Sequence, residues 1–303
     1  MVASHLASTN MAKILGIGIA TLDIINTVNG YPDEDEEVRA LEQRNRRGGN
    51  ASNTLTVLSQ LGHHCAFSGV ITNDNDGCLI KADLQKYQIN TDLCQSATEG
   101  KTPTSYIAHN QLNGSRSIIH FRDLPELSFN TFKSISLEAF DWLHFEGRNI
   151  ENTVKMLDYA ISSASQIKRS IEIEKPRTDI EKLFPFANTL IFSKHYLHAH
   201  GQHEPAVFLA DLHQRLPETD LICSWGEQGA WYHSRHNEQG HCPANFPEKI
   251  IDTLGAGDTF NAGLINALLT KKSLNHATHQ ACKLAGQKCG QQGLNLDIET
   301  YRA

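Results

Sequence analysis

The sequence predicts an α/β fold in which a mostly parallel central sheet is flanked by helices. Short apolar runs rich in Ile and Val alternate with longer amphipathic stretches, which is the sequence form of repeated strand–helix–strand units. The chain has 303 residues, of which 40% are apolar and 20% charged, so it can bury one large core. The alternation favours this fold class, whereas the length by itself fits either two small domains or one large one.

The expected elements follow this alternation along the chain. Sheet strands are predicted at 13–20, 66–71, 142–145, 170–174, 189–192 and 221–225. Helices are predicted at 51–61, 152–163, 205–215, 259–269 and 274–291. No internal repeat or Pro/Gly-rich linker divides the chain, so we expect a single domain over residues 11–303. Residues 1–10 are polar and precede a second methionine, Met11, and we expect them to form a disordered leader.

Two pairs of strand-like runs break the alternation. Runs 104–109 and 115–121 are joined through Asn113-Gly114, a strong hairpin signal, and runs 24–28 and 37–41 flank an acidic tip at 33–37. Hairpins do not fit inside a parallel sheet, so we assign both, at about 24–41 and 104–121, to a small sheet that projects as a lid. An exposed lid face needs cover, and the lid of a second subunit would supply it. A homodimer through the lid sheets is therefore expected.

Bulk properties exclude several function classes. The net charge of −7 comes without a basic stripe, which argues against nucleic acid as a partner, and no apolar run approaches membrane-spanning length. Seven cysteines, an odd number without regular spacing, follow no secretory signal, so we expect a reduced cytoplasmic setting. The sixteen histidines lack metal-ligand spacing and are expected at the surface.

The segment 255–259 (GAGDT) is the strongest chemical signal in the chain. Gly255, Ala256 and Gly257 precede a predicted helix, so their amides are placed at a helix start, which attracts anions, and glycine lets a phosphate approach the backbone. A carboxylate beside a phosphate would repel it unless it has another task. Asp258 therefore suggests a base that accepts a proton from an attacking hydroxyl.

Three further segments each have two interpretations. Asn50 and Asn53, after Gly48-Gly49, share a helical face and suit sugar hydroxyls, although an ordinary helix cap has the same residues. Asp23 follows the first predicted strand, where it either accepts two sugar hydroxyls or caps a loop. Segment 224–229 (SWGEQG) is either a nucleotide loop or a plain β-turn.

Together, 48–50 (GGN) and 252–260 (DTLGAGDTF) resemble the two signatures of the ribokinase-like (PfkB) carbohydrate kinases. The likeness runs from Ile14 to about Gly293 and is greatest to members that phosphorylate fructose at C1. It includes 46–53 (RRGGNASN), 144–149 (HFEGRN), 174–177 (EKPR) and 285–290 (AGQKCG). The resemblance implies a ribokinase-like fold and ATP-dependent phosphorylation of a ketohexose, with D-fructose as the favoured acceptor.

The resemblance also implies a set of residue roles. Asp23, Gly49, Asn50 and Asn53 would hold the ketose, Asp258 would be the base, and the amides of Gly255, Ala256 and Gly257 would form the anion hole. Arg116 would contact nucleotide phosphate, and Gly226, Glu227, Gln228, Gly229 and Cys289 would line the nucleotide site. Glu174 and Glu227 are candidates for the Mg²⁺ environment, through water, and K⁺ is a further candidate cation. Asp35 would reach the sugar site of a partner subunit.

Two departures from the family pattern bear on these expectations. Many members carry an N-x-x-E motif, and the corresponding run here is 193–196 (SKHY), with neither residue in place. The lid run 118–123 (IIHFRD) also differs, and the lid helps to set sugar specificity. Ribose, a nucleoside or a keto-deoxy sugar acid are therefore alternative acceptors. A non-catalytic sugar sensor would have lost Asp258 or its flanking glycines, and all are intact.

Overall fold

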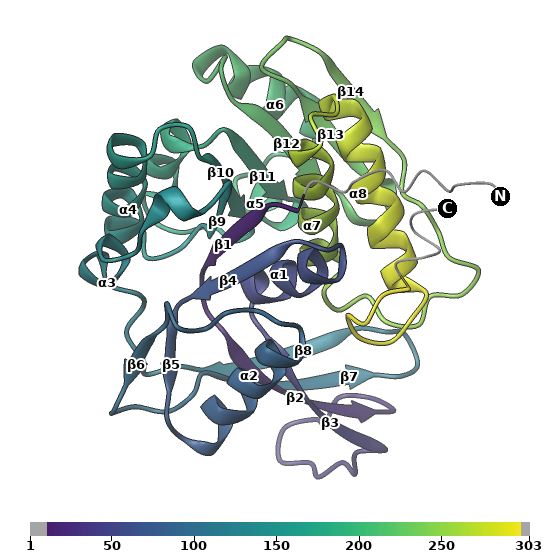
Figure 1. The fold of residues 1–303 in the computed structure, drawn as a ribbon. Coiled ribbons are helices and arrows are strands. Elements are labelled where there is room, and N and C mark those ends of the chain that lie inside the picture. Colours follow the sequence, from purple (N-terminus) through teal and green to yellow (C-terminus); the bar gives the residue numbers. More distant parts are fainter. Residues whose placement is uncertain (1–10, 298–303) are drawn as a thin grey trace, which may run out of the picture.

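The structure, a computed structural model, describes residues 11–297, so the predicted leader lies outside the described residues. Its centre is an eight-stranded sheet in the order β14-β13-β12-β11-β10-β9-β1-β4, in which β13 alone runs antiparallel to the other strands (Figure 1). The strands are β1 (Lys13–Ile17), β4 (His64–Ser68), β9 (Trp142–Glu146), β10 (Lys168–Ile173), β11 (Thr189–Ser193), β12 (Asp220–Ser224), β13 (Ala230–His233) and β14 (Gln239–Cys242). The predicted fold class is confirmed.

Helices cover both faces of this sheet because the strand residues alternate between two cores. In β1, Leu15 and Ile17 pack into one core, and Ile14 packs into the other. The first core is covered by α3 (Phe129–Lys133), η1 (Leu137–Ala139), α4 (Ile150–Ser163), η2 (Ile180–Phe186), α5 (Lys194–Ala199) and α6 (Pro205–Arg215). The opposite face is covered by α1 (Asn50–Gln60), α2 (Asn75–Lys86), α7 (Ala256–Leu269) and α8 (Leu274–Cys289). Within the described residues, no helix is long and apolar enough to cross a membrane.

The predicted helices all occur, with ends that differ by at most a few residues, but one predicted strand is divided. Residues 66–71 form the end of β4 and the start of β5 (Val70–Thr72), which leaves the central sheet to pair with β6 (Gln95–Ala97). The break falls at Gly69, where a Cβ would lie 2.5 Å from the carbonyl oxygen of Gly18. The chain therefore changes sheets where its backbone packs closely against the residue that follows β1.

A separate four-stranded sheet, in the order β3-β2-β7-β8, projects from the central sheet as the predicted lid (Figure 1). Its strands are β2 (Thr21–Val28), β3 (Glu42–Gly48), β7 (Thr104–Asn110) and β8 (Arg116–Phe121). The hairpin over 104–121 is confirmed, but the strand expected at 37–41 is wrong. The partner of β2 is β3, which begins where Thr27 pairs with Glu42. Its polar sequence (EQRNRRG) hid it, because the lid strand is held by backbone pairing and carries little apolar surface.

Candidate active site

A cleft of about 400 Å³ lies between the lid and the carboxyl ends of the central strands. This is the edge at which open α/β sheets bind ligands. Its walls come from the lid, from the first turns of α1 and α7, and from the ends of β9 to β12. Of the residues singled out above, the cleft is lined by Asp23, Gly49, Asn50, Asn53, Arg116, Glu174, Gly255, Gly257 and Asp258.

Asp258 stands in the first turn of α7 and is only 7% exposed. Its Oδ2 accepts a 2.7 Å hydrogen bond from Nδ2 of Asn53, 205 positions earlier in the chain. Burial is the main reason that the pKa of Asp258 is raised to about 7; the bond from Asn53 opposes the rise, and the negative charges of Glu174 and Glu146 add to it. A carboxylate with a pKa near neutral pH suits proton abstraction from a hydroxyl.

The start of α7 is open to an anion. Gly255 precedes the helix with φ of 80°, a left-handed conformation that glycine adopts without strain, and no side chain caps this helix end. The N–H of Ala256 donates to the carbonyl of Thr253 at 3.2 Å, whereas the next amides, of Gly257 and Asp258, have no acceptor inside the helix. A Cβ at Gly257 would meet no atom within 4 Å, so the space beside it is free for a phosphoryl group.

Asn53 joins the two signature segments. Its Nδ2 donates to Asp258, and its Oδ1 accepts a 2.9 Å bond from Arg47, whose Nε pairs with Asp83 at 2.7 Å. Both polar atoms of the Asn53 amide are thus engaged within the chain. The structure places Asn53 as an orienting partner of Asp258, and its predicted contact with sugar stays a prediction.

Asn50 contacts two glutamates at the end of β10. Its Nδ2 donates to Glu172 at 3.0 Å and to Glu174 at 3.1 Å, so its Oδ1 is the atom left to accept a bond from a ligand in the cleft. The other carboxylate oxygen of Glu172 accepts from Asn261 at 2.9 Å. Burial, followed by the charge of Asp258, raises the pKa of Glu172 well above its usual value.

Glu172 is a site residue that the sequence analysis did not identify. The signal was available, because a charged residue in the middle of a buried strand is costly and needs a reason. Glu146 was missed in the same way. Its Oε1 accepts the N–H of Ala51 at 2.9 Å, and its Oε2 pairs with Arg148 at 3.0 Å, so this carboxylate fixes the start of α1 against β9.

Asp23 lies within β2, one element later than the loop after β1 in which the sequence placed it. Its Oδ1 accepts from the hydroxyl of Thr21 at 2.9 Å, and burial raises its pKa. A Cβ at Gly48 would lie 2.2 Å from Oδ2 of Asp23, so the glycine before the turn leaves room for this carboxylate. Asp23 lines the cleft from the lid side.

The predicted nucleotide residues divide into two groups. Arg116, at the start of β8, lines the cleft. The turn η3 (Gly226–Gln228), which follows β12 and is followed by Gly229, contains the other predicted residues Glu227 and Gln228. The cleft lining ends at Ser224, just before this turn, and includes none of its residues. Cys289 lies outside the lining too. Its carbonyl accepts the N–H groups of Ile251 and Asp252 at 2.8 and 3.3 Å, next to the anion-hole segment.

A metal site is not assembled by side chains alone in the described part of the chain. No group of three or more His, Cys, Asp or Glu residues there is arranged to hold an ion. Glu174 lines the cleft and Glu227 does not, so the two predicted residues do not share one wall. Glu146, Glu172 and Glu174 together give the cleft an acidic side, which fits a Mg²⁺ ion that keeps its waters and is bound mainly by phosphate.

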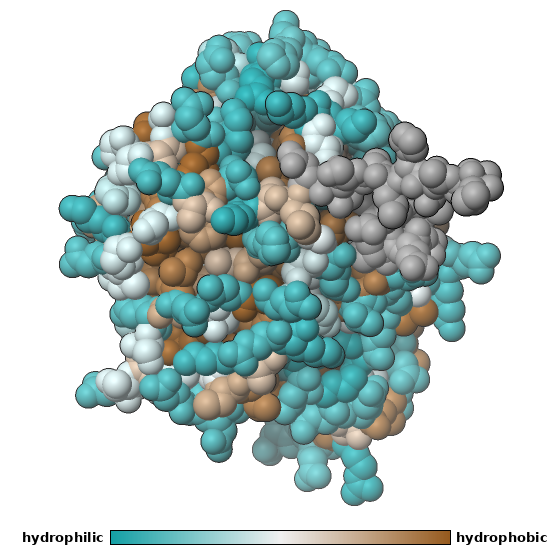
Figure 2. Space-filling view, in the orientation of Figure 1, coloured by the Kyte–Doolittle hydropathy of each residue, from teal (hydrophilic) through white to brown (hydrophobic). Residues whose placement is uncertain are grey.

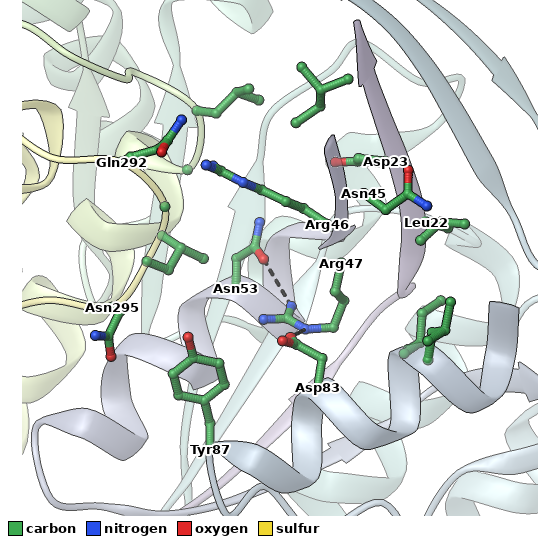
Figure 3. A pocket seen from close by; sticks show the side chains of 17 residues that line it. Leu22, Asp23, Asn45, Arg46, Arg47, Asn53, Asp83, Tyr87, Gln292 and Asn295 are labelled. Atoms are coloured by element: carbon green, nitrogen blue, oxygen red, sulfur yellow. Dashed lines mark hydrogen bonds and ion pairs between the residues drawn. The ribbon is translucent and has the colours of Figure 1, made fainter. Parts of the chain in front are cut away.

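A second cavity, also of about 400 Å³, lies behind Asn53 and Gly255, between the lid, α2 and the segment 292–295 (Figure 3). Arg46 and Arg47 enter it from β3 and point in different directions, as neighbours in a strand do. Arg47 turns toward Asp83 of α2, and Arg46 extends across the cavity toward Gln292.

Comparison with known proteins decides the family. The family model of the pfkB family carbohydrate kinases matches residues 11–301, which is nearly the whole chain. The chain belongs to the PfkB family of carbohydrate kinases. The predicted resemblance is thereby confirmed, and the chain is an ATP-dependent sugar kinase by family.

Individual relatives agree with this assignment. The chain is 39% identical over 292 residues to ketohexokinase of Mus musculus, a match that covers 93% of this chain and 98% of the relative. It is 26% identical over 296 residues to ribokinase of Bacillus subtilis, covering 93% and 96%.

Solved structures share the fold. Ribokinase from Giardia lamblia superposes with a TM-score of 0.82 at 17% identity, covering 94% of this chain and 96% of that one. Ribokinase from Cryptococcus neoformans in complex with ADP gives a TM-score of 0.77 at 19% identity, covering 96% and 99%. The predicted ribokinase-like fold is confirmed.

Proposed function

We propose that the chain transfers the γ-phosphoryl group of ATP to the C1 hydroxyl of a ketohexose, with D-fructose as the favoured acceptor. The observation that carries the proposal is the placement of Asp258. A buried carboxylate with a raised pKa lies next to the open amides of α7, in a chain that is 39% identical to a ketohexokinase. A base and an anion site in one cleft are what transfer to a hydroxyl requires.

In the proposed reaction, the bond that forms is matched by the bond that breaks, and the proton has an acceptor in the cleft. The C1 hydroxyl gives its proton to a carboxylate oxygen of Asp258 as its oxygen attacks the γ-phosphorus, a new O–P bond forms, and the bond to ADP breaks. The amides of Gly255 and Gly257 and the positive end of α7 stabilise the charge on the transferred group, while the N–H of Ala256 is bonded to the carbonyl of Thr253. Arg116 contacts phosphate oxygens. Bound Mg²⁺ would neutralise the phosphates, with Glu174 holding its waters.

Sugar recognition is proposed to come from the opposite walls of the cleft. Asp23 accepts hydrogen bonds from two hydroxyls, while Asn50, with its Nδ2 occupied by glutamates, accepts through Oδ1. The φ of 105° at Gly49 and the nearness of Ile19 leave no room for a side chain at this position. Without a side chain, the backbone of Gly49 can approach the sugar closely. The nucleotide base is proposed to lie along residues 226–229 and Cys289, beyond Ser224.

An acceptor panel tests the proposal. D-fructose, D-ribose, a nucleoside and a keto-deoxy sugar acid are each supplied with Mg²⁺–ATP, and ADP release is followed by a coupled assay. We expect D-fructose to have the highest kcat/KM, and phosphorus–carbon coupling in the NMR spectrum of the product to place the phosphate on C1. Preference for another acceptor would keep the kinase and replace the substrate. Sugar binding without ADP release would indicate a sensor instead.

The lid supports a proposed homodimer. It exposes Tyr106, Ile118, Ile119 and Phe121, and hydrophobic side chains are visible at the lid end of the molecule in Figure 2. Ile119 is 74% exposed, so Ile119→Asp would disturb a lid interface without disturbing the core. Sedimentation should show a dimer for the wild type and for Val207→Asp on α6, and a monomer for Ile119→Asp. A monomeric wild type would contradict the proposal.

A cytoplasmic setting and activation by K⁺ are two further proposals. All seven cysteines lie among the described residues and are free, which agrees with a reducing cytoplasm. K⁺ activation is tested by replacing K⁺ with tetramethylammonium at constant ionic strength. An unchanged rate would remove K⁺ from the list of cofactors.

A further inference from the structure

Lys288 of α8 is among the largest side chains that are fully buried, although it carries a charge. Its Nζ donates to the carbonyl oxygen of Asp252 at 2.6 Å and lies 3.2 Å from the Asp252 carboxylate. A buried ammonium is costly unless it is paired and hydrogen-bonded, and here it has both partners on a single residue. That residue lies three positions before Gly255, at the entrance to the anion hole.

Asp252 collects further donors. Its carboxylate accepts the N–H groups of Leu254 at 2.9 Å and Gly293 at 3.0 Å, and it pairs with Arg46 at 2.9 Å. Burial opposes ionisation of Asp252, but the bond from Gly293 and the charge of Lys288 outweigh it and lower its pKa to about 2. The carboxylate is therefore charged at neutral pH, and it ties the anion-hole segment to α8 and to the chain after it.

Arg46 brings the lid into this network. It belongs to β3, and its side chain spans the second cavity (Figure 3). Elsewhere among the described elements, the lid strands pack on one another and on α2, and none packs extensively against α7 or α8. The Arg46–Asp252 pair, 206 positions apart in sequence, is thus a direct link between the lid and the segment that begins the anion hole.

We propose that Arg46 and Lys288 are positioning residues that couple the lid to the anion hole through Asp252. Neither touches the reacting atoms. Lys288 fixes the backbone at Asp252, Asp252 fixes Leu254 next to Gly255, and Arg46 makes this arrangement depend on where β3 stands. When the lid is in place over the sugar, the amides at the start of α7 are aligned for the transferred phosphoryl group. The inference rests on the proposed kinase reaction.

The kinetic test compares Arg46→Met with Arg44→Met. Arg44 lies two positions away on the same lid strand, and its Nε pairs with Glu42 of that strand at 3.5 Å, so its loss removes a lid arginine without touching Asp252. Anion-hole alignment matters most in the transition state, so we expect kcat of Arg46→Met to fall about tenfold or more, with sugar KM within about twofold. Arg46→Lys should recover part of the rate, and Lys288→Met should lower kcat at least as far. A kcat for Arg46→Met equal to that of Arg44→Met would overturn the coupling.

A second readout does not depend on the acceptor. Hydrogen exchange of a peptide that covers 252–259 should be faster in Arg46→Met and Lys288→Met than in the wild type and in Arg44→Met, while exchange in the central strands stays the same. If Lys288→Met fails to fold, the Arg46 series still decides the question. Unchanged exchange in Arg46→Met would overturn the inference even if the kinase acts on another sugar. Faster exchange with no activity on any sugar would leave the coupling standing and reject the proposed reaction.

Discussion

Replacement of Asp258 by Asn removes the proposed base while changing one atom. Asn still accepts a bond from Asn53 through its carbonyl oxygen, so the link between α1 and α7 is retained. Loss of a general base costs about 10² to 10⁴-fold in rate, which is about 3 to 5 kcal/mol of activation free energy. We therefore expect Asp258→Asn to bind fructose and ATP normally and to lose at least about a hundredfold in kcat.

The stability of the same variant carries a second expectation. Burial raises the pKa of Asp258 from 3.8 to about 7, so the folded state holds this proton more tightly than the unfolded state does. The wild-type protein therefore loses stability as pH rises from about 4 to 7, by roughly 4 kcal/mol at 1.36 kcal/mol per pKa unit. Asn carries no such cost. Asp258→Asn should melt at a higher temperature than the wild type at pH 8.

The pH profile supplies the third part of this test. Only the ionised carboxylate accepts a proton, so kcat/KM of the wild type should fall about tenfold per pH unit below about 7 and reach a plateau above it. Asp141→Asn, at an exposed position that accepts a bond from Lys13, is the matched control and should behave as the wild type. Near-normal turnover of Asp258→Asn, or a pH profile that matches that of the wild type, would show that Asp258 is not the base.

Three other substitutions probe the surroundings of the base. The added methyl group of Gly257→Ala meets open space, so this variant should fold normally. The methyl group would occupy the phosphoryl position, so steady-state kinetics should show at least about a tenfold loss in kcat, and full activity would contradict the anion hole. Gly49→Ala places a side chain at a residue with φ of 105°, with its Cβ 2.0 Å from the backbone oxygen of Ile19. Calorimetry should therefore show that the protein is destabilised by more than about 2 kcal/mol, and an unchanged melting temperature would be inconsistent with this turn. Asn53→Ala removes the bond that lowers the pKa of Asp258, so the midpoint of the pH profile should move above about 7; a midpoint moved the other way would reject its orienting role.

Local sequence signals were enough for the central architecture. Apolar runs such as 142–145 and 189–192 are buried strands because both faces of the sheet are covered, and helical spacing placed α6 at its observed bounds. The double-glycine turn and the GAGDT segment were recognisable because glycine adopts the positive φ found at Gly49 and Gly255 without strain. The segments that form the cleft at the carboxyl ends of the strands were therefore predictable from short, contiguous sequence patterns.

Long-range and polar features were harder to predict. Strand β3 has no apolar pattern and is defined by its pairing with β2, so the run before it was chosen instead. The role of Glu172 depends on Asn50 and Asn261, which lie 122 and 89 positions away. The pair of Arg46 and Asp252 is equally remote in sequence. Such contacts form only when the chain has folded, and no local periodicity in the sequence predicts them.

One carboxylate, that of Asp258 at the start of α7, is proposed to face both the acceptor hydroxyl and the phosphoryl group. A crystal structure with D-fructose and a non-hydrolysable ATP analogue tests it directly. We predict that O1 of the sugar lies within hydrogen-bond distance, about 3 Å, of a carboxylate oxygen of Asp258 and in line with the γ-phosphorus. A sugar that binds in the second cavity, or that turns C1 away from Asp258, would contradict the account.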